Sequence, residues 1–141
     1  MSSAPSQTHP DESPVLALVL ETNREAPSVA RAAIAGFSED RELGENTLAT
    51  LTLLVSELVT NAVIHPEVDD PGDIQLRARF AGDVIRVEVT DGGDGFEPRP
   101  RDPTRSDRGY GLYLLEKQAE RWGVERADGT TVWFELSVRA A

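Results

Sequence analysis

Glu57 and Asn61 have the residue types and the spacing of a site that handles a metal ion and phosphate. They stand four residues apart in the segment SELVTNAVIH, so they lie on one stripe of the helix expected there. Carboxylate and amide oxygens are hard ligands suited to Mg²⁺, which also takes phosphate oxygens. Glu57 is alternatively a general base, a role that requires a water or hydroxyl group within hydrogen-bond reach.

His65 continues this stripe at the end of the helix and precedes Pro66. A histidine at such a position caps the last carbonyl groups and interacts favourably with the negative end of the helix dipole. Capping is therefore the favoured interpretation of His65, and a functional role stays open.

Two glycine-rich segments lie on either side of an arginine-rich loop. DGGDGF, at 91–96, follows an apolar run, and RGYGLYLL, at 108–115, opens a helical stretch. Glycines at the start of a helix let backbone amides approach a phosphate group. The arginines of the loop are Arg99, Arg101, Arg105 and Arg108. Neither a P-loop motif nor the strand–GxGxxG–helix arrangement of a dinucleotide site occurs in the sequence.

Two helices are expected in the first half of the chain. Pro27 suits the first turn of a helix whose predicted inner stripe is Val29, Ala32, Ala33 and Phe37. A second helix is predicted over 45–65, where Pro66 ends it. Its apolar positions step by three and four, as a single buried face requires: Leu48, Leu51, Val55, Leu58 and Ala62. Glu57 and Asn61 are expected on a stripe that flanks this face.

Strict alternation of apolar and polar residues predicts strands over 74–80, 85–90 and 132–138. Ala81-Gly82-Asp83 is a predicted hairpin turn between the first two. A further strand is expected over 15–21, and 124–126 is expected to pair with 131–138. A third helix is predicted over 110–121, with an inner stripe of Leu112, Leu115 and Ala119. The expected fold is a two-layer α+β sandwich, in which about three helices cover one face of a mixed, mostly antiparallel sheet.

Length, composition and charge indicate one globular domain. The 141 residues suffice for a single core, and we expect a disordered tail over 1–13 and one domain over 14–141. The net charge of −11 argues against non-specific binding to nucleic acid or to an anionic membrane. No apolar run approaches the ~20 residues of a membrane span, and the start lacks a secretory pattern, so the cytoplasm is the expected location. Without cysteine, disulfides and thiolate metal sites are excluded.

The three motifs, taken in order, resemble the nucleotide-binding boxes of the GHKL ATPase superfamily, which has the Bergerat fold. These are ExxxN on a helix (Glu57, Asn61), DxGxG after a strand (Asp91, Gly93, Gly95) and GxG before a helix (Gly109, Gly111). The chain length and the segment TTVWFELSV resemble more narrowly the stand-alone anti-sigma factors and serine-protein kinases of the RsbW and SpoIIAB type. The resemblance extends over about residues 15–138.

This resemblance implies a site for ATP with Mg²⁺. Asp91 would accept a hydrogen bond from the adenine amino group, and Gly93 would let the backbone pass close to the purine. Asn61 would hold Mg²⁺ bridged to the phosphates, and Glu57 would activate the attacking hydroxyl group or water. The remaining implied contacts are Gly95, which shapes the loop, Arg105 or Arg108 of the lid, and the phosphate-binding amides of Gly109 and Gly111.

The resemblance also implies a role in transcription regulation. The protein would sequester a sigma factor, and it would phosphorylate a serine of an anti-sigma antagonist. The alternative is a docking module without kinase activity, with or without bound ATP; the presence of Glu57 favours the kinase, because docking needs no base. A homodimer is also implied. One departure from the pattern is Asp128-Gly129-Thr130-Thr131 in the last hairpin, where relatives often carry a lysine.

Overall fold

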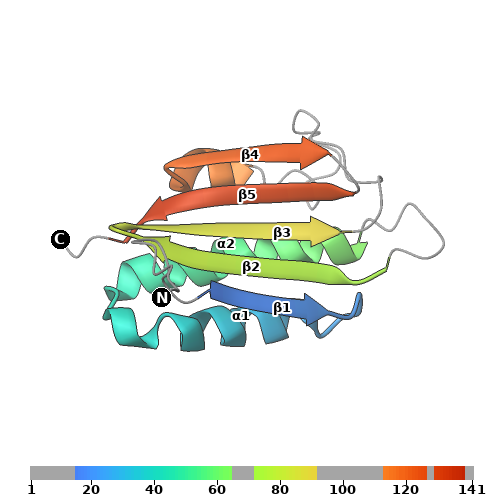
Figure 1. Cartoon of the computed structure of the whole chain (residues 1–141), viewed down its shortest axis with the longest axis horizontal. Helices are drawn as coiled ribbons and strands as arrows, with labels where there is room; N and C mark the ends of the chain where they lie inside the picture. Colours follow the sequence, from blue (N-terminus) through green and yellow to red (C-terminus); the bar gives the residue numbers. More distant parts are fainter. Residues whose placement is uncertain (1–14, 65–71, 92–112, 127–128, 139–141) are drawn as a thin grey trace, which may run out of the picture.

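A five-stranded sheet carries helices on one of its faces (Figure 1). The computed structural model describes residues 15–64, 72–91, 113–126 and 129–138. The first half of the chain contains β1 (Val15–Leu20), α1 (Ala26–Phe37), the 3₁₀ turn η1 (Glu39–Arg41) and α2 (Glu45–Ile64). The second half contains β2 (Ile74–Ala81), β3 (Val84–Asp91), a helical segment at 113–118, β4 (Arg121–Arg126) and β5 (Thr130–Ser137).

The strands follow the order β1-β2-β3-β5-β4, and every described pairing is antiparallel. β2 and β3 form a hairpin through Gly82 and Asp83, where Gly82 has a φ of 62°, a conformation that favours glycine. The predicted hairpin and the predicted two-layer α+β fold are therefore confirmed. β3 lies at the centre of the sheet, between β2 and β5.

The core lies between the sheet and the helices, and alternate strand residues build its sheet side. The buried strand residues include Ile74, Leu76, Ala78, Phe80, Ile85, Val87, Val89, Val132, Phe134 and Leu136. On α2 the predicted face is confirmed, because Leu51, Val55, Leu58 and Ala62 are buried and Leu48 packs against the cluster. The strand alternation and the α2 period thus meet in one apolar layer.

The predicted inner stripe of α1 is correct only in part: Phe37 packs against the core and Ala33 is half-buried, but the other two residues are exposed. Ala26, Ala30 and Ile34 are the buried residues of this helix, whereas Val29 is 46% exposed and Ala32 faces solvent. The buried set repeats at every fourth residue, and its two alanines let the helix backbone come close to its neighbours. α1 has apolar or small residues on several sides, so the helical period of its sequence fits two adjacent stripes. Packing against the sheet and α2 decides which of the two stripes is buried.

The end of the predicted third helix is also wrong. Helical residues are described at 113–118, and the amide of Ala119 donates to the carbonyl of Leu115 at 2.9 Å. The amide of Glu120 already donates to the carbonyl of Glu135 at 2.8 Å, so the chain joins the sheet there. Arg121 is consequently the first residue of β4 rather than the last of a helix.

The tail predicted over 1–13 lies outside the described residues and stays a prediction, as does the single domain over 14–141. Among the helices that the structure describes, none is long and apolar enough to cross a membrane.

The corrected orientation of α1 is tested by a pair of alanine substitutions. Ile34→Ala removes a fully buried side chain and is expected to lower the free energy of unfolding by about 2–5 kcal/mol. Val29→Ala, on the exposed side of the same helix, is expected to change it by less than about 0.5 kcal/mol. Urea unfolding of both variants measures the difference. An equal loss in both would show that α1 packs on a different face.

Candidate functional site

α2 brings Glu57 and Asn61 to the sheet by burying its apolar face. Leu54, Leu58 and Asn61 follow one another at helical spacing and are all buried. Asn61 is 1% exposed, so it belongs to the buried face itself, whereas Glu57 is half-buried at its margin. The predicted position beside the buried face therefore fits Glu57 and not Asn61.

The amide of Asn61 is a buried polar group without a partner. Neither its Oδ1 nor its Nδ2 makes a hydrogen bond to any described residue. An unsatisfied buried polar group costs about 1–3 kcal/mol relative to a satisfied one. An apolar side chain at this position of α2 would avoid that cost, so the amide marks a place where a ligand with polar groups would improve the structure.

The carboxyl group of Glu57 is perturbed by the same packing. Burial raises its pKa above the ordinary value of 4.5, because a low-dielectric surrounding disfavours the charged form. A raised pKa brings a carboxylate closer to neutral pH, where a general base works best. Glu57 and Asn61 are four residues apart, so a half-buried carboxyl group lies beside a buried amide on the same side of α2.

Asp91 is the last residue of β3 and lies at the edge of the same region. In the sheet it is paired with Ile74 of β2 on one side and with Thr130 of β5 on the other. It shares the helix-facing side of the strand with Val89, because alternate residues point the same way. α2 contacts β3, and its C-terminal end lies behind the C-terminal end of β3 (Figure 1). Of the first two motifs, the described residues Glu57, Asn61 and Asp91 therefore lie toward one end of the sandwich.

Thr130 is a candidate site residue that the sequence analysis missed. It is 1% exposed, and its Oγ1 has no hydrogen-bond partner among the described residues. Residues directly opposite in an antiparallel pair have Cβ atoms about 4.5–5.5 Å apart, which places the hydroxyl group beside Asp91. The signal was present in the sequence: Thr130 stands two residues before Val132, at an inward position that the alternation reserves for an apolar side chain.

The other predicted site residues lie outside the described residues. They are His65, Gly93, Gly95, Arg105, Arg108, Gly109 and Gly111. The described part of the chain holds no cluster of three or more histidine, cysteine, aspartate or glutamate side chains that could bind a metal ion. A divalent ion at Asn61 would consequently need oxygen atoms from a ligand as well as from the protein, as Mg²⁺ commonly has with phosphates.

Comparison with known proteins identifies the family. The model of the family described as "Histidine kinase-like ATPase domain" matches residues 20–136. This chain belongs to that family. The matched range runs from the end of β1 to β5 and therefore includes Glu57, Asn61, Asp91 and Thr130. The resemblance drawn from the three motifs is confirmed at this level.

Several relatives carry names from transcription regulation. An anti-sigma F factor of Lysinibacillus sphaericus is 31% identical over 121 residues, which are 78% of this chain and 83% of the relative. An anti-sigma F factor of Thermoanaerobacter sp. (strain X514) is 30% identical over 110 residues, or 72% of this chain and 77% of the relative. The serine-protein kinase RsbW of Bacillus subtilis (strain 168) is 29% identical over 117 residues, or 74% and 73%.

A solved structure shares the fold. The crystal structure of the RsbU and RsbW domains of Rv1364c from Mycobacterium tuberculosis superimposes with a TM-score of 0.71 over 92% of this chain, at 24% sequence identity. The matched region is 34% of the length of that solved chain. The likeness supports the α+β architecture.

The perturbed carboxyl group of Glu57 is expected to make stability depend on pH. Since its pKa is raised in the folded protein, the folded state holds the proton more tightly than the unfolded chain does. The contribution of Glu57 to wild-type stability therefore falls as pH rises from about 4.5 through the raised pKa. Glu57→Gln lacks this loss, so its stability relative to wild type should increase between about pH 4 and pH 7, as urea unfolding at a series of pH values would measure.

Glu116→Gln is the matched control, because Glu116 is exposed on the helical segment at 113–118. Its stability relative to wild type should change little over the same pH range. A difference between Glu57→Gln and wild type that is independent of pH would contradict the raised pKa.

Proposed function

We propose that this protein binds ATP with Mg²⁺ between the C-terminal part of α2 and the ends of β3 and β5. The observation that carries the proposal is the fully buried, unpartnered amide of Asn61. The Oδ1 atom of Asn61 would be a ligand of the bound divalent ion. Its Nδ2 group would remain available to donate a hydrogen bond to an oxygen atom of the phosphates. Membership of an ATPase domain family supports ATP as the nucleotide.

Asp91 and Thr130 would bind the adenine ring. An ionised carboxylate only accepts hydrogen bonds, which suits the amino group of adenine as donor. The Thr130 hydroxyl group both donates and accepts, so it is able to complete a contact to the ring nitrogens or to a water beside Asp91. Their positions directly opposite each other on β3 and β5 fix the separation of the two groups.

The remaining roles rest on residues outside the described part of the chain. Gly93 and Gly95 would shape the loop after β3, Arg105 or Arg108 would contact phosphate from the lid, and Gly109 and Gly111 would offer backbone amides. When bound, Mg²⁺ neutralises negative charge on the phosphate groups. The protein's own part is to hold the nucleotide in position and to keep a base next to the attacking oxygen atom.

We further infer that the protein is an anti-sigma factor with serine-protein kinase activity toward an anti-sigma antagonist. The names of the relatives support this assignment. Glu57 would accept the proton of the attacking serine hydroxyl group, which forms a bond to the γ-phosphorus while the bond to the leaving ADP oxygen breaks. A cytoplasmic location and a homodimer belong to the same proposal.

The second candidate function is a docking module that binds ATP, or no nucleotide, and regulates its partner without phosphorylating it. Such a module would need the sheet and helices but no base at the position of Glu57. The half-buried carboxyl group with its raised pKa favours the kinase.

Nucleotide binding is tested by substitutions at the two unpartnered side chains and at Asp91. Asn61→Ala and Asp91→Ala are each expected to weaken the affinity for Mg²⁺-ATP at least about tenfold, or ~1.4 kcal/mol. Thr130→Val keeps the shape of the side chain and should weaken it several-fold, the value of about one hydrogen bond. Isothermal titration calorimetry with the full chain measures the dissociation constants.

Neighbouring residues of the same types provide the controls. Asn46→Ala changes an exposed residue at the start of α2. Thr131→Val removes a hydroxyl group on the other side of the sheet, whose oxygen atom lies 2.6 Å from that of the Thr90 hydroxyl group. Both should keep the affinity of wild type for ATP. Unchanged binding in Asn61→Ala, Asp91→Ala and Thr130→Val together would exclude a nucleotide site here.

Phosphoryl transfer separates the kinase from the docking module. The substrate to be tested is a small antagonist protein with an acceptor serine, sought among the genes next to that of this protein. Glu57→Gln should keep the dissociation constant for ATP within about threefold and lower the rate of transfer about 10²–10⁴-fold, the usual contribution of a general base. Transfer of radiolabelled phosphate measures the rate, with Glu116→Gln as control. If wild type binds the antagonist and transfers no phosphate, the docking module is the correct function.

A further inference from the structure

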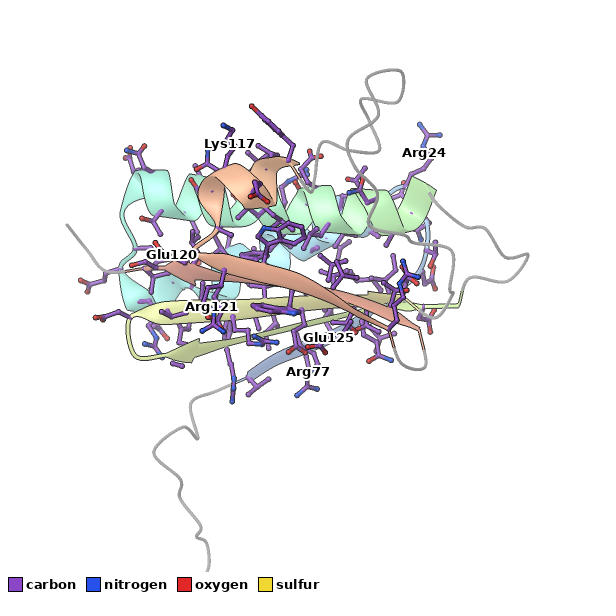
Figure 2. All side chains as sticks on the ribbon, turned by 90° about the horizontal axis from the view of Figure 1, so that it is seen from above. Arg24, Arg77, Lys117, Glu120, Arg121 and Glu125 are labelled. Carbon is purple, nitrogen blue, oxygen red and sulfur yellow. The ribbon has the colours of Figure 1, made fainter. Side chains whose placement is uncertain are left out.

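The sheet face opposite the helices carries a pocket that the proposed nucleotide site does not use. It is lined by Val15, Arg77, Ala78, Arg79, Arg86 and Glu88 and has a volume of about 160 Å³. These residues belong to β1, β2 and β3. Figure 2 shows Arg77 on the side of the sheet that faces away from α1 and α2, whereas Arg24 and Lys117 lie on the helix side. The pocket and the candidate ATP site are therefore on different faces of the molecule.

Arg86, which lines this pocket, is bound by neighbouring side chains. Its Nε donates to Oε2 of Glu88 at 3.0 Å, and its NH1 group donates to Oε2 of Glu135 at 3.1 Å. The guanidinium also lies over the Trp133 ring, 4.1 Å from the ring centroid. A Cβ atom at Gly123 would come within 2.8 Å of the same ring, so the ring lies directly on that glycine. Arg86, Glu88 and Trp133 thus already satisfy one another.

Arg77 and Arg79 differ from Arg86, because neither forms an ion pair or a side-chain hydrogen bond with any residue that the structure describes. Acidic residues outnumber basic ones in this chain, 25 against 14, and Arg77 stands directly opposite Glu88, yet the Glu88 carboxylate is bound to Arg86 instead. Arg79 also stands directly opposite Arg86, and like charges in that position destabilise a sheet. An added anion would relieve this repulsion.

The geometry of the two arginines favours an extended peptide. They are two residues apart on β2, so they point the same way at a spacing of about 7 Å along the strand. An extended peptide repeats its side chains at the same spacing. Beside them, β1 places Val15 opposite Arg79 and Ala17 opposite Arg77. Val15 is 47% exposed and Val19 63% exposed, which gives the pocket an apolar border on an edge strand.

We propose that this face binds an extended acidic segment of a partner protein. The segment would present two carboxylates, at positions i and i+2 of its chain, to Arg77 and Arg79. The charge of the site supports this occupant: Glu88 lines the pocket, but its carboxylate is held by Arg86. The net charge of −11 opposes a long phosphate polymer, whereas a short acidic segment needs only these local donors.

The test measures binding of a fluorescein-labelled peptide, Ser-Glu-Val-Glu-Val-Glu-Ser, to the full chain by fluorescence anisotropy at about 50 mM salt, where screening is moderate. Arg77→Gln/Arg79→Gln is expected to raise the dissociation constant about tenfold, consistent with the loss of two partly exposed ion pairs. Arg24→Gln/Lys117→Gln removes the same charge from the helix side and should change it less than twofold. A peptide with its glutamates consecutive should bind more weakly.

A second variant keeps both arginines in place. Ala17→Glu puts a carboxylate directly opposite Arg77 and should compete with the peptide, with a similar rise in the dissociation constant. Affinity for ATP should stay at the wild-type value in all these variants, so the outcome does not depend on the proposed nucleotide site.

Three results would overturn the proposal. They are absence of peptide binding to wild type, equal losses in the two double variants, and a change of oligomeric state when Arg77 and Arg79 are replaced. The last result, measured by sedimentation velocity, would assign the face to a second copy of this chain.

Discussion

Burial of polar groups without partners is the constraint around which the candidate site is built. Among the described residues, four polar side chains are buried: Ser38, Ser56, Asn61 and Thr130. The two serines donate to carbonyl groups of their own helices, at 2.8 Å and 3.1 Å. The other two have no partner, and they lie at the same end of the sandwich. The core therefore satisfies its polar groups wherever the backbone can do so, and the exceptions coincide with the ATP site that we propose.

These exceptions bear on the stability of the protein without its ligand. An amide and a hydroxyl group that lack partners, together with a carboxyl group that is partly desolvated at Glu57, each disfavour the folded state. A ligand that satisfies several of these groups at once would stabilise the folded protein by mass action. Binding and folding are thus linked through the same few residues.

The period of two along the strands separates the chemistry of the two faces. Thr130 and Thr131 are adjacent, yet the first is buried among the helix-facing residues and the second pairs its hydroxyl group with that of Thr90 on the open face. On β2, Arg77 is likewise exposed, whereas the adjacent Ala78 is buried in the core. Because each strand serves both faces, a nucleotide site and a peptide-binding face can occupy one small sheet without sharing a side chain.

The sequence predicted the sheet more accurately than it predicted the helices, for a physical reason. Alternation over eight residues has one solution, since a shift of one residue would put Arg77 or Glu88 into the core. α1 offers no such contrast, because alanines occur on several sides of this helix. The sequence therefore predicted Val29 on the buried side, whereas Ala30 and Ile34 are the buried residues. Thr130 was missed, although the alternation places it inward, because threonine is common in strands and therefore did not stand out. Glu57, Asn61 and Asp91 could be proposed from the sequence because each stands in a short motif, and their roles stay predictions.

Glu57 is the residue on which the choice between catalysis and docking depends. A carboxylate at the margin of a buried helix face has a larger desolvation cost in its charged form than a neutral glutamine of nearly the same shape. If α2 served only to complete the core, an apolar or amide side chain would be the more stable choice at this position. The carboxylate gains a function only where a proton must be accepted next to the phosphates or where a water must be held there, and the first of these is what transfer to a serine requires. Its position four residues before Asn61 keeps that base on the stripe of α2 that leads to the proposed phosphate site.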